Sequence, residues 1–150
     1  MKFAVDCMLG KLAKWLKILG FDTVYFSKIE DKDLVRLARN ESRILLTRDT
    51  GILSKSGPPW IFFIQSEDWR EQISQVIHEF ELEKEIRPFS RCIDCNRNLK
   101  DLPKPRARNL VTPFVYGNAE SFSMCPDCGR VFWKGTHHKD MIVKIKKILK

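Results

Sequence analysis

Short apolar runs alternate with helical patterns over the first half of the chain. Runs of adjacent apolar residues, each typical of a buried strand, occur at 2–5, 23–26, 44–46 and 60–64. Apolar residues spaced three and four apart predict helices at 9–19, at about 31–40 and at 68–80. Because strands that alternate with helices form parallel sheets, the pattern predicts an α/β fold with a parallel sheet of about four strands flanked by helices.

Loop and cap residues separate these elements. Gly20 follows the first predicted helix as a natural stop, and Asp31 or Asp33 can cap the second. Residues 54–59 combine two serines, a glycine and two prolines, so we expect a loop there. We find no internal repeat in the chain.

The composition changes near residue 88. Residues 88–136 carry two cysteine pairs, several prolines and few helical patterns, whereas residues 137–150 read as a basic amphipathic helix. We expect a first domain at 1–87, a small second module at 88–136 and the helix at 137–150. We favour a helix that docks by its apolar stripe and leaves its lysines solvated, with phosphate contact by those lysines as the alternative.

The charge is placed unevenly along the chain. Residues 1–88 carry 14 Lys and Arg against 14 Asp and Glu, and residues 89–150 carry 13 against 5, so the whole net charge of +8 lies in the last part. A basic module beside a neutral domain indicates a polyanionic partner, most often nucleic acid. Simple solubility is the other explanation of the same excess.

Targeting segments are not evident. The apolar stretches are far shorter than the roughly 18 residues expected of a membrane-spanning helix. The chain begins on a strand-like run without the layout of a signal peptide. We therefore expect no membrane partner and a cytoplasmic location, where five cysteines do not predict a disulfide framework.

Two Cys-x-x-Cys pairs predict a metal site. Paired knuckles in a reducing compartment are typical of a closed, structural Zn²⁺ site with four thiolate ligands in a zinc ribbon. A thioredoxin-like redox site needs one such pair at a helix start and fits less well. The predicted zinc ligands are Cys92, Cys95, Cys125 and Cys128. Cys7 is left over, and we expect it to be a small buried core residue.

Carboxylates at the ends of predicted strands form a second candidate site. Asp6 ends the first strand, Asp49 follows the third, and Asp31 begins a helix, with Asp33 as its rival. Hard cations such as Mg²⁺ and Mn²⁺ prefer carboxylate oxygens, and paired ions can activate water against a phosphodiester. Alternatively, Asp31 or Asp33 only caps a helix and Asp49 only serves a turn.

Basic and aromatic residues offer contacts to phosphates and bases. A proline-rich basic loop at 104–109 has no apolar face and suits phosphate contact. The candidate phosphate ligands are Lys11, Lys14, Lys17, Arg43, Arg48, Arg106 and Arg108. Aromatic side chains of the second module could stack a base, but we favour packing of the small zinc core for Phe114, Tyr116, Phe122, Phe132 and Trp133. His137 and His138 are expected at the surface rather than on the metal.

Taken together, these segments carry a resemblance to a known family. The chain resembles the Mut-seven C-terminal RNase family in five segments. These are residues 6–22, the spacing of Asp31 with Leu34 and Leu37, the run 43–49, Cys92–Asn96 and the stretch 125–137. This family joins a PIN-like nuclease domain to a C-terminal zinc ribbon. The resemblance implies a PIN-like fold, metal-dependent RNA cleavage and catalytic roles for Asp6, Asp31 and Asp49.

The sequence departs from the resemblance in two respects. Lys14 and Lys17 stand where arginine is expected, and a fourth acid has no clear counterpart beyond Glu41. We interpret the chain as a metal-dependent ribonuclease, an endonuclease that uses Mg²⁺ or Mn²⁺. Its zinc ribbon is expected to bind RNA, and the ribosome or a tRNA is a candidate partner. The alternatives are a non-catalytic RNA-binding or ribosome-associated adaptor and a protein-interaction module. The sequence does not define the oligomeric state.

Overall fold

The computed structural model describes residues 1–53 and 60–150. The loop expected at 54–59 therefore lies outside the described residues. Within the described part, no helix is long and apolar enough to cross a membrane.

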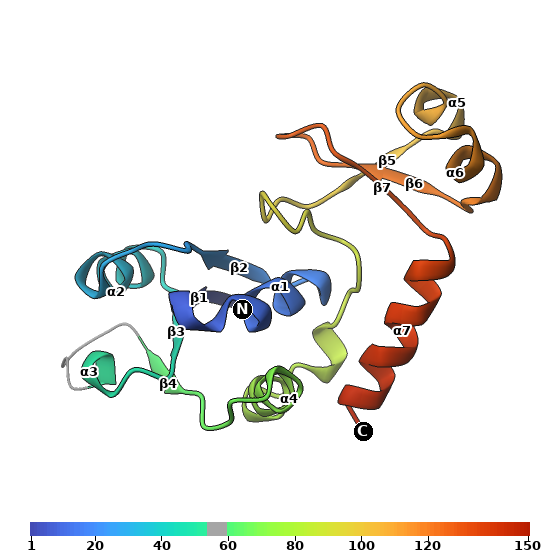
Figure 1. The fold of residues 1–150 in the computed structure, drawn as a ribbon. Coiled ribbons are helices and arrows are strands. Elements are labelled where there is room, and N and C mark those ends of the chain that lie inside the picture. The colour runs from blue at the N-terminus through green and yellow to red at the C-terminus, as the bar shows by residue number, and fades with distance from the viewer. Residues whose placement is uncertain (54–59) are drawn as a thin grey trace.

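The first half of the chain forms a four-stranded parallel sheet, as predicted (Figure 1). Its strands are β1 (Lys2–Val5), β2 (Asp22–Tyr25), β3 (Ile44–Thr47) and β4 (Ile61–Phe63). They lie in the order β2-β1-β3-β4, with β1 paired in parallel to both β2 and β3. The chain first moves from β1 to one side and then crosses back to the other, so a topological switch point lies between β1 and β3.

Helices cover both faces of this sheet. The helices of the first half are α1 (Gly10–Ile18), α2 (Asp31–Asn40), α3 (Thr50–Leu53) and α4 (Trp69–Glu79), with a 3₁₀ turn at Cys7–Leu9 before α1. Phe3 and Val5 point into a core shared with α1 and α4, whereas Ala4 between them points into a second core shared with α2. This alternation is the reason that three successive positions of β1 are apolar.

The helix ends differ in one respect from the prediction. Gly20 adopts φ +97° just after α1, the left-handed geometry that favours glycine in this place. The N-cap of α2 is Glu30, not Asp31 or Asp33, so the predicted cap was wrong. Both aspartates instead lie in the first turn of α2, where negative charge interacts favourably with the helix dipole.

The second module is a three-stranded antiparallel sheet with two short helices. Its strands lie in the order β5 (Lys100–Leu102), β6 (Phe122–Met124) and β7 (Val131–Trp133). A 3₁₀ turn at Glu83–Glu85 precedes the module, and α5 (Lys104–Ala107) and α6 (Pro113–Asn118) contribute to its small core around Phe122 and Leu102. The basic segment expected as a loop at 104–109 thus begins as a helix, because Pro103 and Pro105 suit the first turn of one.

The last helix, α7 (Thr136–Ile148), returns to the first domain. Ile145 is 5% exposed and belongs to the same core as α1 and α4, with Met141, Ile148 and Leu149 packed around it. Lys144, Lys146 and Lys147 remain exposed. The structure therefore confirms the docking helix with a solvated lysine face, and the helix begins one residue before the predicted start at residue 137.

Backbone hydrogen bonds fasten the connecting segment to the end of α1. The Arg87 and Phe89 N–H groups donate to the Leu19 and Ile18 carbonyls at 2.8 Å each. The Arg91 guanidinium donates to the Gly20 carbonyl at 3.0 Å. A side chain at Gly20 is excluded here as well, because its Cβ would lie 2.4 Å from the Arg87 carbonyl oxygen.

Candidate active site and zinc centre

The three candidate acids all lie at the carboxyl edge of the parallel sheet. Asp6 directly follows β1, Asp49 lies two residues after β3, and Asp31 begins the helix after β2. Because β1 lies between β2 and β3, these positions come from three adjacent strand–helix connections. The crevice outside the carboxyl ends of β1 and β3 is the place where open α/β sheets bind their ligands.

Thr47, which the sequence analysis did not single out, connects two of these acids. Its hydroxyl donates to Asp6 Oδ2 at 2.8 Å and accepts from the Asp49 N–H at 2.9 Å. Thr47 itself is fully buried at the end of β3, and Asp6 is only 4% exposed. The sequence did contain a signal for this contact. Thr47 is a polar residue at the end of an otherwise apolar strand, and such a residue needs a hydrogen-bond partner, which the aspartate at the end of a neighbouring strand can supply.

Asp49 also has a local role. Its Oδ1 accepts a hydrogen bond from the Gly51 N–H at 2.8 Å, at the start of α3. The turn role considered from the sequence is therefore real, but it uses one carboxylate oxygen and leaves Asp49 half-buried at the sheet edge.

The thiol of Cys7 lies near two of the acids, and both of them affect its pKa. Burial raises the pKa of its thiol, and Asp6 and then Asp31 raise it further. Cys7 is half-buried rather than buried, so the expectation of a core residue was wrong. The Tyr25 hydroxyl donates to its carbonyl at 2.8 Å, and a Cβ at Gly10 would meet that hydroxyl oxygen at 2.8 Å. Gly10 thus allows the contact that holds the loop behind Asp6.

The three carboxylates are close in the fold without forming a compact ligand set. Among the described residues, the four cysteines are the single group of three or more Cys, His, Asp or Glu side chains whose ligand atoms lie within 4.8 Å of one another. Asp6, Asp31 and Asp49 therefore share one edge of the sheet at wider spacing.

Two of the candidate phosphate ligands are exposed on α1. Lys11 lies near the carboxyl edge, with its Nζ 5.2 Å from the centre of the Trp69 ring. That ring stacks on Trp15 at 4.8 Å and carries the Arg70 guanidinium at 4.5 Å. Lys14 is exposed one turn further along α1. A cationic edge on a stacked tryptophan pair is a feature that the sequence pattern did not reveal, because Trp69 is 58 residues from Lys11.

Arg43 does not lie where a substrate ligand should be. It directly precedes β3, at the amino edge of the sheet and opposite the acids, and it is buried. Its guanidinium donates to Asp22 Oδ1 at 2.8 Å and to the Phe3 carbonyl at 3.2 Å, and it also pairs with Glu41. This position does not fit the predicted contact with phosphate. Glu41, the weak candidate for a fourth acid, lies at this same distant edge.

Arg48 and Lys17 are likewise engaged by the protein. The Arg48 guanidinium donates to the Ile64 carbonyl at 3.0 Å and to the Gln65 carbonyl, which ties β3 to the end of β4. Lys17 is buried at the far end of α1, where burial lowers the pKa of its ammonium and the charges of Asp94 and Cys92 oppose that shift. Lys17 therefore faces the zinc ribbon rather than the acids.

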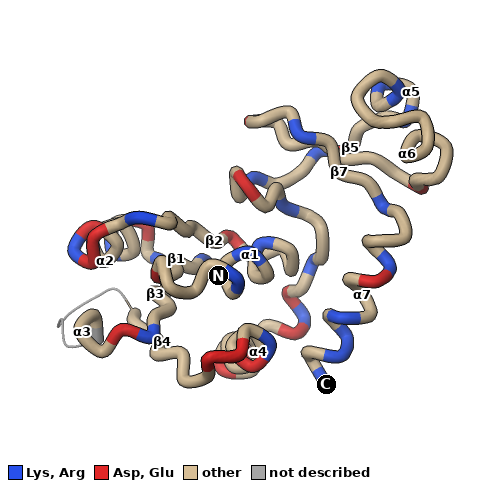
Figure 2. Tube along the Cα trace, in the orientation of Figure 1, with Lys and Arg blue, Asp and Glu red and all other residues tan. Residues whose placement is uncertain are grey.

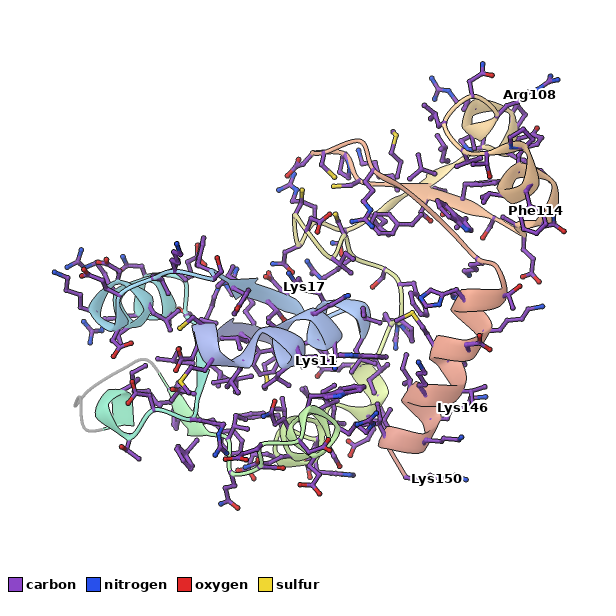
Figure 3. All side chains as sticks on the ribbon, viewed as in Figure 1. Lys11, Lys17, Arg108, Phe114, Lys146 and Lys150 are labelled. Carbon is purple, nitrogen blue, oxygen red and sulfur yellow. The ribbon has the colours of Figure 1, made fainter. Side chains whose placement is uncertain are left out.

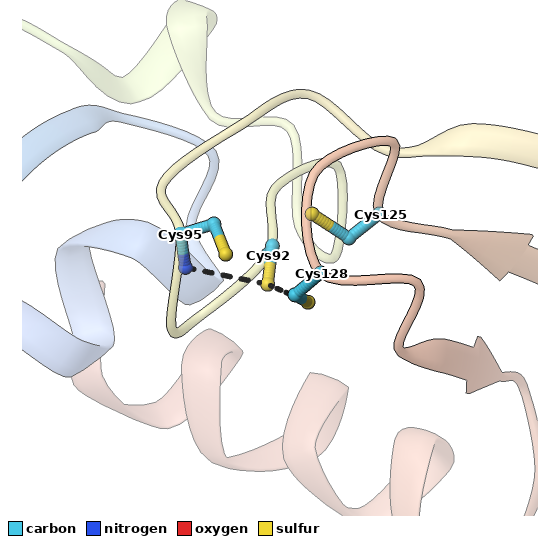
Figure 4. Close-up of side chains that lie close together, drawn as sticks. All are labelled: Cys92, Cys95, Cys125 and Cys128. Carbon is cyan, nitrogen blue, oxygen red and sulfur yellow. Dashed lines mark hydrogen bonds between the residues drawn. The ribbon is translucent and has the colours of Figure 1, made fainter.

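The four cysteines come together as predicted (Figure 4). The Cys92 and Cys128 sulfurs lie 3.9 Å apart, and the Cys95 N–H donates to the Cys92 sulfur at 3.4 Å. A tetrahedral zinc ion with Zn–S bonds of about 2.3 Å would place its sulfurs about 3.8 Å apart. The donor set and its spacing therefore fit Zn²⁺, held by Cys92, Cys95, Cys125 and Cys128.

The two knuckles repeat one six-residue pattern that the sequence analysis missed. Residues 92–97 and 125–130 both read Cys-x-Asp-Cys-x-Arg. In each, the first cysteine N–H donates to the arginine carbonyl at 2.9 Å, and the fifth residue, Asn96 or Gly129, has positive φ. The aspartate of each knuckle pairs with the arginine of the other, at 2.6 Å for Asp94–Arg130 and 3.2 Å for Asp127–Arg97. The knuckles are thus crosslinked reciprocally around the metal position.

The first knuckle is also bonded to the parallel sheet. The Asn96 side chain accepts from the Thr23 N–H at 2.9 Å and donates to Asp22 Oδ1 at 2.7 Å. Asp22 in turn accepts from Arg43. Burial raises the pKa of Asp22, but the hydrogen bonds from Arg43 and Asn96 outweigh it and hold that pKa below its usual range. The zinc ribbon is therefore anchored at the amino edge of the sheet, at the opposite end of α1 from the acids.

The remaining candidates lie on the ribbon and at the start of α7. Arg106 and Arg108 are exposed on and just after α5, and Arg108 and Phe114 lie at the outer end of the ribbon (Figure 3). Phe122 and Tyr116 pack the small core, as expected. Phe114 is 76% and Trp133 45% exposed, and Phe132 faces away from this core, so the packing expectation was wrong for these three. The His138 ring lies 4.2 Å from the Phe89 ring and is half-buried rather than at the surface.

These features define a class of protein: a doubly wound α/β domain with carboxylates at its switch point, joined to a four-cysteine zinc-ribbon module. A family model for the Mut7-C RNAse domain matches residues 1–145, and the chain belongs to this family. This confirms the resemblance drawn from the sequence, and it gives the chain a nuclease-like, RNA-related function with RNA as the substrate that the family implies. No curated protein and no solved structure matches the chain.

Proposed function

We propose that the chain is a metal-dependent ribonuclease that hydrolyses internal phosphodiester bonds of RNA at the carboxyl edge of its parallel sheet. The observation that carries this proposal is the Asp6–Thr47–Asp49 connection at the switch point, in a chain of an RNase family. A nuclease needs fixed carboxylates that face an open crevice, and the switch point of a doubly wound sheet supplies both.

The residues at this edge fit a hard divalent cation. Asp6 is almost completely buried, and none of the ion pairs among the described residues includes it. Its side chain is hydrogen-bonded to the Thr47 hydroxyl and the Cys7 thiol, neutral groups that compensate a buried carboxylate poorly. We propose that Asp6, Asp31 and Asp49 hold Mg²⁺ or Mn²⁺, which supplies an activated water and neutralises charge on the phosphate.

The chain's own residues prepare this site. Thr47 fixes one oxygen of Asp6 and the backbone of Asp49, so both acids keep their orientation without a metal. Lys11 and Lys14 lie along α1 on the path away from the acids and offer their ammonium groups to phosphate oxygens. Arg106 and Arg108 on the ribbon would contact more distant phosphates, in line with the basic balance of the last 62 residues.

The zinc ion would have a structural role in this scheme. Four thiolates close its coordination shell, so zinc holds the ribbon rather than reacting. Figure 2 shows basic residues on α5 and mixed charges on α2 and α4, which supports RNA contact by the ribbon. Reduced cysteines are consistent with action in the cytoplasm.

A cleavage assay tests the proposal. Purified protein is incubated with a panel of single-stranded and structured RNAs in Mg²⁺, Mn²⁺ or EDTA, with zinc content measured before and after. We expect metal-dependent internal cuts that Asp6→Asn and Asp49→Asn abolish, whereas the exposed Asp101→Asn serves as the matched control. Cleavage that survives both site variants would overturn the mechanism. Comparison of Asp31→Asn with Asp33→Asn decides which of the two acids in the first turn of α2 contributes.

A second function has one observation in its favour. The three carboxylates are spaced more widely than the four cysteines, as expected of an adaptor that binds RNA without cutting it. Such an adaptor, free or on the ribosome or a tRNA, would bind the RNA panel in a salt-sensitive manner and leave every RNA intact in both metals. That result would replace the nuclease proposal.

A further inference from the structure

A cleft lies between the two halves of the molecule. Its volume is about 510 Å³, and its walls come from α1, the segment around Phe89–Leu99, β6 with β7, and the first turns of α7. This volume falls in the range of small-molecule and nucleotide sites, roughly 300–1,000 Å³. The cleft is separate from the carboxyl edge, because its contribution from α1 is Lys14 and Ile18 rather than the residues beside Asp6.

The lining of the cleft is cationic. Lys14, Arg91, Arg130 and Lys134 line it, and no aspartate or glutamate does among the described residues. Two of these cations are held in place: Arg91 donates to the Gly20 and Asn96 carbonyls, and Arg130 pairs with Asp94. Lys14 and Lys134 form no ion pair within the described part of the chain, and both are exposed. Their ammonium groups are available to an anion.

Aromatic rings complete the same walls. Phe132 points from the sheet face that carries Ser121 and Ser123, opposite to the face that packs the ribbon core. The Arg130 guanidinium lies 5.2 Å from the centre of its ring. Lys134, whose N–H donates to the Ser121 carbonyl at 3.2 Å, returns to the same face as Phe132, whereas Trp133 between them is paired with Phe122 and points to the other face. A half-buried phenyl ring next to exposed lysines is a combination that binds a base and its phosphates.

We propose that this cleft binds one unpaired nucleotide of a single-stranded RNA, with its base against Phe132 and its flanking phosphates on Lys14 and Lys134. The choice of RNA rests on the proposed function. The lining itself excludes cationic ligands, and a cleft of this volume cannot admit a duplex, whose bases are already stacked. A single strand has bases that can leave their stack and enter.

The cleft is connected to the acids by α1. Lys11, Lys14 and Ile18 follow the i, i+3, i+7 spacing of one helix face, and this nine-residue helix is about 14 Å long. A strand held in the cleft at Lys14 therefore passes Lys11 on its way to Asp6. The cleft would thus select RNA with an unpaired residue at a set distance from the bond that is cut.

Fluorescence anisotropy with labelled RNA tests this assignment independently of cleavage. The zinc-loaded full chain, without added Mg²⁺ or Mn²⁺, is titrated with a 12-nucleotide single strand and with a blunt duplex of the same sequence. We expect Phe132→Ala to weaken single-strand binding about tenfold, the lower part of the range for lost base stacking. The double variant Lys14→Ala/Lys134→Ala should reduce the slope of log Kd against log salt by about 1.4, for two lost phosphate contacts.

Matched controls separate the cleft from general charge and aromaticity. Lys146→Ala/Lys150→Ala removes the same charge from α7 and from the residue that ends the chain, and both side chains project into solvent (Figure 3). Phe114→Ala removes an exposed aromatic from the ribbon. Both should bind within about twofold of the wild type. Equal losses in the control and cleft variants, or unchanged binding in the cleft variants, would overturn the proposal.

The two proposals fail in different ways. Normal cleavage together with unchanged binding in the cleft variants removes the cleft and leaves the nuclease. Absent cleavage together with selective loss of single-strand binding in the cleft variants removes the nuclease and supports the cleft.

Discussion

Substitution of Thr47 tests most directly how Asp6 and Asp49 are held at the carboxyl edge of the sheet. Replacement by valine keeps the shape of the side chain but removes the donor to Asp6 Oδ2 and the acceptor of the Asp49 N–H. Loss of a hydrogen bond to a charged, buried group costs about 2 kcal/mol, and loss of the neutral one about 1 kcal/mol. The expected destabilisation of Thr47→Val is therefore about 2–3 kcal/mol.

The serine variant is the control. Thr47→Ser keeps the hydroxyl and removes one methyl group from a fully buried position, which costs about 1 kcal/mol. Urea unfolding of the zinc-loaded chain, followed by circular dichroism, distinguishes the two. For a slope of about 2 kcal/mol per molar urea, the valine midpoint should fall by about 1–1.5 M and the serine midpoint by about 0.5 M. The valine variant should also lose RNA cleavage, because its carboxylates lose their orientation.

The relative stability of Thr47→Val and Thr47→Ser tests whether the hydroxyl holds this edge. If Thr47→Val is as stable as the wild type, or more stable than Thr47→Ser, then packing of the methyl group and not the hydroxyl holds this edge, and the reasoning is refuted. A change in the slope of the unfolding curve in either variant would indicate an altered unfolded or native state rather than the loss of a bond.

Three further predictions follow from other contacts. Hydrogen bonds from Arg43 and Asn96 hold the pKa of Asp22 below its usual range, so the stability that the Asp22 carboxylate gives the fold should be complete above about pH 4 and be lost as the pH falls through the folded pKa. The urea midpoints of wild type and Asp22→Asn should therefore differ at pH 6 and converge in acid. A difference between the two midpoints that stays constant with pH would contradict this. Ile145→Ala should cost about 2–4 kcal/mol and accelerate tryptic cleavage within α7, as followed by mass spectrometry, whereas equal digestion rates would place α7 outside the core. Cys125→Ser should reduce bound zinc from one ion per chain to none by elemental analysis, and a retained ion would exclude the four-thiolate site.

The regular elements of the first domain could be predicted because they depend on local pattern. Each of the four strands lies within two residues of its predicted range, since strands buried on both faces read as uninterrupted apolar runs. The order β2-β1-β3-β4 follows from no local pattern, and neither do α3, α5 and α6. These helices span four to six residues, and helices so short depend on tertiary contacts for their stability.

The acids and cysteines could be found by position and spacing, but their supporting residues could not. Asp6 and Asp49 stand at strand ends, and the cysteines stand at fixed intervals. Whether Arg43 reaches a phosphate or a buried aspartate depends on which edge of the sheet it occupies, and that is decided by the strand direction and not by the residue type. Phe132 was assigned to the core for a similar reason: an aromatic residue in a short strand does not reveal which side of a three-stranded sheet is covered.

The bond between Asn96 and β2 has a consequence for how sequences of this family can diverge. Asn96 must tolerate positive φ for the knuckle and must also present an amide to Thr23 and Asp22. Glycine satisfies the first requirement, as it does at Gly129, but not the second. Positions 22 and 96 are therefore expected to covary among relatives, and a change at one without the other should mark proteins whose ribbon has a different orientation on the sheet.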